Sequence, residues 1–155
     1  MKTATKGNEA EAMILCALVE RGFEVSVPFG GGQPYDLVVD LGGFDLLKVQ
    51  CKTGWLHKSC ISFNARSTDH GQGRRPYTGL AHIFGVYFPP TRSVYLVPLD
   101  VAGFNGRLRL EPTRNNQQKG VRFAADYEID RWSAERLLET KREAELSAEP
   151  ELNFA

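Results

Sequence analysis

The stretch PYDLVVDLGGFDLLKVQCKTG, residues 34–54, carries polar side chains whose types could do chemistry. Two apolar runs flank a Gly-Gly turn, and their polar residues fall at even positions: Asp36, Asp40, Lys48, Gln50 and Lys52. Side chains alternate across a β-strand, so each strand gathers its polar groups on one face. Carboxylate and amide oxygens suit a hard divalent cation, and a lysine beside them could orient or deprotonate a water.

The two strands share one polar face only if even residues pair with even residues. A two-residue turn at Gly42-Gly43 would pair Asp36 with Val49 and separate the two polar sets. A three-residue loop or a single bulge pairs Asp36 near Gln50 instead. The sequence therefore predicts an odd-numbered loop, with the odd strand positions forming an apolar face.

The solvent side of any antiparallel sheet also alternates, so the polar face has a plain structural explanation. Three details favour a site instead. Asp36 begins a strand although Asp is depleted in strands. Lys52 lies deep in an otherwise apolar run. The third detail is an acidic residue in the first predicted helix.

That residue is Glu11, in a helix predicted from about Asn8 to Arg21 and ended by Gly22. Glu11 shares the helical spacing of Ile14 and Leu18, which form an apolar stripe. A carboxylate on a core-facing stripe needs a partner, because burying it unpaired is costly. The alternative is a stripe that frays at its N-terminus, where the helix dipole also favours Glu.

The remaining elements must hold this hairpin in place. Strands are expected at 23–27, 37–39, 46–53, 82–88 and 93–99, loops at 29–33, 64–79 and 112–124, and a last helix after the cap residue Ser133. This order predicts an α/β fold with a mixed central β-sheet flanked by helices. We expect a single domain, with a core over residues 1–132 and an acidic helix and tail over residues 133–155.

Composition bounds the function without choosing it. The formal net charge is zero, but residues 133–155 hold three basic and six acidic residues, which gives −3 and leaves +3 on residues 1–132. A mildly basic body permits a nucleic-acid partner without requiring one. No apolar run approaches the ~20 residues that cross a membrane. The three cysteines have no disulfide spacing, so we expect a cytoplasmic protein in a reducing compartment.

The residues Asp36 and Gln50-Cys51-Lys52 resemble the skeleton of the PD-(D/E)XK nuclease superfamily. The wider match resembles its small single-domain endonucleases, which include Holliday junction resolvases and group I intron homing endonucleases. It covers most of residues 6–130 through KGNEAEA, ERGFEVSVPFG, YDLVVD, KVQCKTG, RRPYTG, VYLVPLD and NNQQKGVRFA. Two departures are Tyr35, which separates Pro34 from Asp36, and Gln50, which replaces the usual Asp or Glu. Gln occurs at this position in the homing endonuclease branch, and it should weaken metal affinity.

The resemblance implies a restriction-endonuclease-like core and Mg²⁺-dependent hydrolysis of DNA, with Mn²⁺ able to substitute. Asp36 would be the main metal ligand, joined by the Gln50 amide oxygen, the Cys51 backbone carbonyl, and Glu11 directly or through water. Lys52 would orient or deprotonate the attacking water and stabilise the developing charge. A homodimer is implied, with a tetramer as the alternative, because one site per chain does not cut two strands.

Basic, amide and aromatic residues in loops or beside the site are expected to contact DNA. The expected contacts are Lys6, Gln33, Lys48, Arg66, Arg74, Arg75, Tyr77, Asn115, Asn116 and Lys119. Amide runs are also often only solvated, and core packing explains Tyr77 and Trp55 better than stacking on DNA. A zinc site at Cys51 is disfavoured because that residue points to the apolar face. His82 is isolated in the sequence.

The expected substrate is branched DNA such as a Holliday junction, and two alternatives to this interpretation remain. The short chain leaves little room for a sequence-reading domain, which favours a structure-selective enzyme acting on four-way junctions. The amide-rich loops and Gln50 favour a site-specific homing endonuclease. The charge lost at Gln50 also fits an inactive DNA-binding member of the fold. The acidic C-terminal segment could pack on the body, mediate oligomerisation or shield the basic face.

Overall fold

The computed structural model describes residues 2–69, 73–103 and 105–149. Its largest sheet has the strand order β1-β2-β3-β8-β9, and all neighbours are antiparallel except the parallel pair β3 and β8. These strands are β1 (Glu24–Ser26), β2 (Leu37–Asp40), β3 (Leu46–Thr53), β8 (Ile83–Phe88) and β9 (Ser93–Pro98). The prediction of an α/β fold with a mixed central sheet is confirmed.

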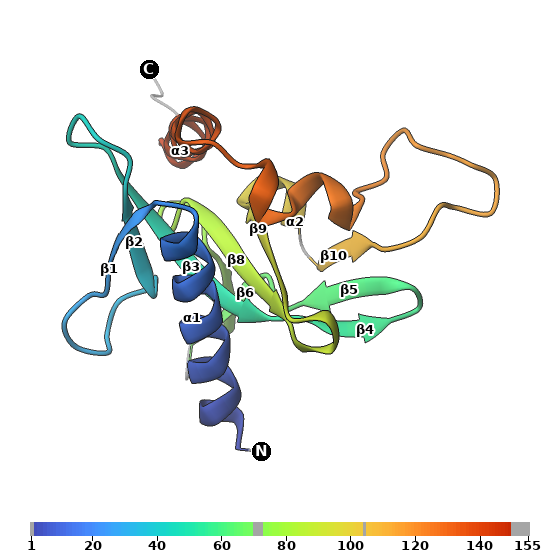
Figure 1. Cartoon of the computed structure of the whole chain (residues 1–155), viewed down its shortest axis with the longest axis horizontal. Helices are drawn as coiled ribbons and strands as arrows, with labels where there is room; N and C mark the ends of the chain where they lie inside the picture. The colour runs from blue at the N-terminus through green and yellow to red at the C-terminus, as the bar shows by residue number, and fades with distance from the viewer. Residues whose placement is uncertain (1, 70–72, 104, 150–155) are drawn as a thin grey trace, which may run out of the picture.

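Helix α1 (Thr3–Glu20) packs on one face of this sheet (Figure 1). Its Ile14 and Leu18 are fully buried against the odd-numbered side chains of β2 and β3. The helix begins earlier than predicted but ends as predicted at Gly22, which has φ 84°. The Gly22 and Phe23 N–H groups donate to the Val19 and Leu18 carbonyls, a Schellman motif that satisfies the last helical carbonyls.

The opposite face of the main sheet is covered by a second sheet, of strand order β10-β5-β4. Its strands are β4 (Trp55–His57), β5 (Cys60–Phe63) and β10 (Gly106–Arg109). Buried side chains of β8, such as Phe84 and Val86, pack against Ile61 and Leu108 of this second sheet. Because β8 is buried on both faces, its sequence is one apolar run, which made this strand predictable. Strands β4, β5 and β10 were not predicted from the sequence.

The predicted loop over residues 64–79 is wrong. It contains a two-stranded antiparallel sheet of β6 (Arg66–Asp69) and β7 (Gly73–Pro76), while residues 70–72 lie outside the described part. The stretch is polar and Gly-rich, so no apolar alternation revealed its strands. The other short elements are helix α2 (Leu99–Ala102) and 3₁₀ turns at Pro89–Thr91, Ala124–Tyr127 and Ile129–Arg131. No described helix is long and apolar enough to cross a membrane.

The β2–β3 hairpin has the predicted odd loop. Val38 pairs with Lys48, and Asp40 pairs with Leu46, so even residues face even residues. The Leu41 N–H donates to the Asp45 carbonyl, which leaves the three loop residues 42–44, all with positive φ. This register gives the two strands a common polar face and a common apolar face.

Helix α3 (Ala134–Ala148) packs on the same face as α1, so the acidic segment lies on the body of the protein (Figure 1). The Ser133 hydroxyl caps it by accepting from the Arg136 N–H at 3.1 Å, as predicted. Leu137 is fully buried in the core shared with α1. Residues 150–155 of the predicted tail lie outside the described part.

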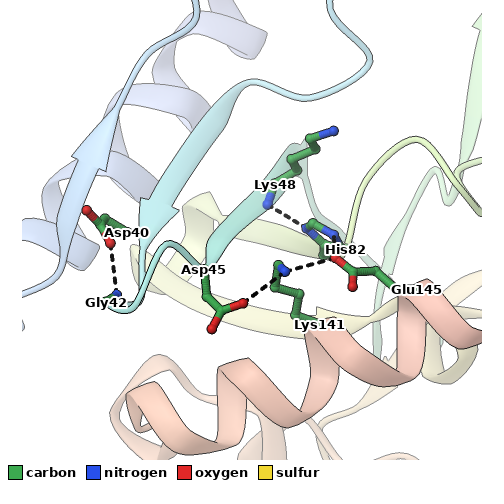
Figure 2. Close-up of polar contacts among 7 residues, drawn as sticks. All are labelled: Asp40, Gly42, Asp45, Lys48, His82, Lys141 and Glu145. Carbon is green, nitrogen blue, oxygen red and sulfur yellow. Dashed lines mark hydrogen bonds and ion pairs between the residues drawn. The ribbon is translucent and has the colours of Figure 1, made fainter.

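A polar cluster joins α3 to the start of β3 and β8 (Figure 2). Lys141 Nζ lies 3.3 Å from Asp45 Oδ1 and 2.9 Å from Glu145 Oε1. Glu145 Oε1 lies 3.1 Å from His82 Nε2, and His82 Nδ1 accepts the Lys48 backbone N–H at 2.8 Å. The sequence suggested that His82 is isolated, but the structure places it within this cluster. Burial lowers its pKa despite the nearby Glu145 carboxylate.

Candidate active site

Asp36 lies directly before β2, where the polar face of the hairpin begins. Its backbone N–H donates to the Val49 carbonyl at 2.9 Å, which fixes the residue against β3. Its Oδ2 accepts the Cys51 backbone N–H at 2.8 Å. Burial raises the Asp36 pKa, and the Cys51 N–H and the Lys52 charge oppose that rise. The carboxyl group is thus held rigidly in a poorly solvated position.

Glu11 reaches this carboxyl group from α1. The Glu11 pKa is raised by burial and then by the negative charge of Asp36. The two carboxylates, 25 residues apart in sequence, therefore lie close enough to repel each other. The structure brings together the helix and strand carboxylates that the sequence predicted as partners.

Lys52 lies on the same face as Gln50, and its ammonium group is held by Tyr77. Lys52 Nζ donates to Tyr77 Oη at 2.9 Å and lies 4.7 Å from the centroid of the Tyr77 ring. Burial lowers the Lys52 pKa, although the Asp36 carboxylate acts in the opposite direction. A lysine with a lowered pKa next to a half-buried carboxylate is typical of an acid–base site.

Gln50 and Cys51 supply oxygens beside these groups. The half-buried Gln50 amide has no hydrogen bond to any described residue. The Cys51 N–H donates to Asp36 Oδ2. The N–H and C=O groups of one strand residue point to the same side of the strand, so the Cys51 carbonyl also points to the side of Asp36. Burial and the two carboxylates raise the Cys51 thiol pKa well above its usual range, so the sulfur stays protonated.

This donor set fits a hard divalent cation rather than a soft one. Among the described residues, no three His, Cys, Asp or Glu side chains are grouped as metal ligands, which leaves two carboxylates, one amide and one carbonyl. All four donors are oxygens, as Mg²⁺ prefers. The repulsion that raises the Glu11 pKa is a second argument, because a bound cation would relieve it.

Some of the residues expected to contact DNA lie beside this site. Lys6 lines a groove of about 920 Å³ together with Cys51 and Lys52. Lys48 is exposed on the polar face, with its ammonium 5.1 Å from the centroid of the Tyr35 ring. Gln33 is exposed in the loop that leads to Asp36.

Other expected contacts lie elsewhere. Asn115, Asn116 and Lys119 are exposed in the long loop after β10, at the end of the molecule away from α1 (Figure 1). Arg66 lies in β6. The backbones of Arg74 and Arg75 lie in β7, and their side chains lie outside the described part.

The two aromatic residues behave differently from each other. Tyr77 is 6% exposed and packs edge-on against Phe84, so the core-packing interpretation holds and its ring is closed to a DNA base. Trp55 is 51% exposed, so core packing is wrong for this residue. The sequence missed the bond from Tyr77 to Lys52, since it joins two residues 25 positions apart and no local pattern links them.

A family model described as PD-(D/E)XK endonuclease matches residues 1–130. The chain belongs to this endonuclease family. The expectation drawn from Asp36, Gln50 and Lys52 is therefore confirmed at the level of the family. In this PD-(D/E)XK endonuclease, Gln50 stands where the family name gives Asp or Glu.

The solved structures include a relative of nearly equal length. The bacterial homing endonuclease I-Ssp6803I matches with a TM-score of 0.66 and 24% sequence identity, over 97% of this chain and 100% of that chain. At this identity the match shows the fold. No curated protein is significantly similar to this PD-(D/E)XK endonuclease.

Proposed function

We propose that this endonuclease hydrolyses DNA with Mg²⁺ held by Asp36, the Gln50 amide, the Cys51 carbonyl and Glu11. The observation that carries the proposal is the grouping of two repelling carboxylates with a lysine of lowered pKa. Mn²⁺ prefers similar oxygen ligands, so it should substitute. The cation would polarise the phosphate and lower the pKa of a bound water.

The side chains of the protein divide the remaining work. Asp36 acts in its ionised form, held in place by the Cys51 N–H. Lys52 Nζ, held by Tyr77, orients a water and in its neutral form accepts one of its protons. The water oxygen bonds to phosphorus, the bond from phosphorus to the 3′ oxygen breaks, and that oxygen takes a proton from solvent. The protonated Lys52 then stabilises the negative phosphate.

The substrate we favour is duplex DNA cut at a defined site. The argument for a four-way junction rested on a chain too short to contain a separate reading domain. I-Ssp6803I, a homing endonuclease, is covered over its full length by a chain of this size, so shortness does not favour the junction. Gln50 and the amide-rich loops fit the same choice.

Oligomerisation belongs to this proposal. One chain holds one Asp36–Lys52 site, so cutting both strands of a duplex needs two copies of it. A closed homodimer is the simplest assembly that presents two sites with matching polarity, and a tetramer is the alternative.

The test compares three labelled DNAs in Mg²⁺: a long mixed-sequence DNA, a linear duplex and a four-way junction built from that duplex. The proposal predicts discrete cuts in the long DNA and none with Lys52→Ala. Cleavage confined to the junction would replace the site-specific interpretation with a junction resolvase. If none of the three DNAs is cut, the proposal fails and the interpretation as an inactive DNA-binding protein replaces it.

A further inference from the structure

A polar groove lies on the second sheet, outside the active site. It has a volume of about 500 Å³, and its wall includes Trp55, His57, Ser62, Asn64, Arg66 and Arg107. No acidic side chain lines it. The groove therefore has the charge that complements a phosphodiester backbone.

Strand register explains why these side chains share one face. Trp55 pairs with Ser62, and Ser62 pairs with Arg107, which forms one row across β4, β5 and β10. Ile61 and Leu108, on the alternate positions, are fully buried in the core. The outer face of this sheet thus presents an indole, a hydroxyl and a guanidinium side by side.

Three polar groups of the groove, on Ser62, Asn64 and Arg107, have hydrogen-bonding capacity that the described part of the chain does not use. The Ser62 hydroxyl is the one buried side-chain oxygen or nitrogen without a hydrogen bond among the described residues, and Ser62 is 8% exposed. Arg107 is exposed and makes no ion pair with the described part of the chain. The Asn64 Oδ1 accepts the Arg66 N–H, which leaves the Asn64 amide N–H groups free to donate. An anionic ligand would satisfy all three groups.

The groove continues from the active site through Trp55. This residue also lines the groove that contains Lys6 and Lys52, so the two grooves share one wall. Trp55 follows Lys52 by three residues, which is at most ~10 Å along an extended chain. Each DNA strand carries a phosphate about every 3.4 Å of helix axis, so the two grooves can hold neighbouring nucleotides of one strand.

We propose that the groove on β4, β5 and β10 binds the DNA backbone flanking the cut, with Arg107 on a phosphate and Trp55 against the adjacent nucleotide. This inference rests on the proposed function, since its ligand is the DNA that the active site cuts. The groove would fix which phosphodiester reaches Lys52. The contact is to the backbone, so it should strengthen binding to DNA of any sequence.

The test measures binding of a labelled mixed-sequence duplex without Mg²⁺, so that nothing is cut. Arg107→Ala should weaken binding about tenfold at low salt and reduce the slope of log K against log salt by about 0.9. Trp55→Ala should also weaken binding but leave the salt slope unchanged, because the indole carries no charge and releases no counterion. The matched control is Arg142→Ala, which removes the same charge from an exposed position on α3 and should leave affinity and slope unchanged.

Cleavage in Mg²⁺, measured beside binding, separates the two proposals. If Arg107→Ala and Arg142→Ala bind DNA with equal affinity, the proposal for the groove is overturned even if the wild type cuts DNA. A wild type that binds through Arg107 but does not cut would uphold the groove and overturn the proposed function. A wild type that does not bind DNA would overturn both. Melting temperatures should match across the variants, because both groove side chains are exposed.

Discussion

The Asp36 carboxylate lowers the stability of the folded state. Its carboxyl group is half-buried, and the carboxylate of Glu11 on α1 lies close enough to repel it. A residue chosen for stability alone would not carry a charge here, since an apolar or amide side chain avoids the desolvation cost. The Cys51 N–H and the Lys52 charge offset only part of that cost, and a bound cation would offset more.

Replacing Asp36 should therefore separate stability from function. Without metal at neutral pH, Asp36→Asn should melt at a higher temperature than the wild type, because it removes a half-buried charge that Glu11 repels. Saturating Mg²⁺ at ~100 times its dissociation constant stabilises a native state by ~2.7 kcal/mol, and only the wild type should gain it. Asp40→Asn, the same change on the exposed end of β2, should keep the metal response. An Asp36→Asn protein that Mg²⁺ still stabilises would place the cation elsewhere.

The raised Asp36 pKa predicts how activity and stability change with pH. Mg²⁺ binds only the ionised carboxylate, so at subsaturating Mg²⁺ the activity should fall on acidification already above pH ~3.9, the usual aspartate pKa. Stability has the opposite sign, because the folded state holds this proton more tightly than the unfolded state. Stability should therefore fall as pH rises from the unfolded pKa to the raised folded pKa. A kcat/KM profile and a melting series over the same pH range test both directions.

Tyr77 is a positioning residue, because it acts through Lys52. Tyr77→Phe removes one hydrogen bond, which is typically worth ~0.5–1.5 kcal/mol, so kcat should fall about two- to thirteenfold with KM unchanged. Tyr95→Phe is the control, since it removes a hydroxyl from a buried tyrosine on β9, two strands from Lys52 in the main sheet. Equal kcat losses in the two variants would mean that the Tyr77 hydroxyl matters only for packing.

At this scale the sequence predicted what strand alternation determines. Asp36, Gln50 and Lys52 follow from a period of two, and Glu11 follows from helical spacing. Alternation does not report contacts across the fold, so the bond between Tyr77 and Lys52 stayed hidden. Trp55 was misassigned because an aromatic residue in an apolar sequence is usually buried, and here it lies on the open face of β4.

At the scale of elements, α3 shows that the acidic segment is part of the structure. Leu137 is fully buried, and Lys141 and Glu145 bond to Asp45 and His82, the residues directly before β3 and β8. We propose that residues 133–149 belong to the same domain as the core over residues 1–132. Glu135, Glu139 and Glu143 are exposed on this helix, while Leu137 lies in the core that α3 shares with α1.

A pair of leucines on α3 tests this proposal. Leu137→Ala should lower the free energy of unfolding by ~2–5 kcal/mol, as is usual for a fully buried leucine. Leu146→Ala, at a position 67% exposed on the same helix, should change it by less than ~0.5 kcal/mol. Equal, small effects in urea unfolding would show that α3 is not part of the cooperative domain.

Elements were predictable where burial is one-sided. The β2–β3 hairpin and its odd loop followed from alternation, and the Gly22 terminus followed from the need for a positive φ. Strands β4 and β5 were missed for a physical reason: β4 is exposed throughout and β5 is buried throughout, so neither alternates. The β6–β7 pair was missed because its residues are polar and glycine-rich.

At the scale of the molecule, two layers carry two tasks. The main sheet with α1 positions Asp36, Glu11 and Lys52, and the second sheet presents a cationic face next to them. The net charge of zero does not reveal this cationic face, because the acidic residues of α3 balance it in the sum. In the structure, α3 lies apart from the groove on β4, β5 and β10 (Figure 1). Charge distribution, rather than total charge, is what fits DNA.

The most direct test of the account is the rate of Mg²⁺-dependent cutting of a long mixed-sequence DNA by four proteins: wild type, Lys52→Ala, Asp36→Asn and Asp40→Asn. The account predicts that Lys52→Ala and Asp36→Asn lose at least ~100-fold in rate, as expected for a lost proton acceptor or metal ligand, while Asp40→Asn cuts like the wild type. Chelating the metal should stop all cutting. Cutting by Lys52→Ala at the wild-type rate would contradict the account, because the catalytic lysine would then lie elsewhere.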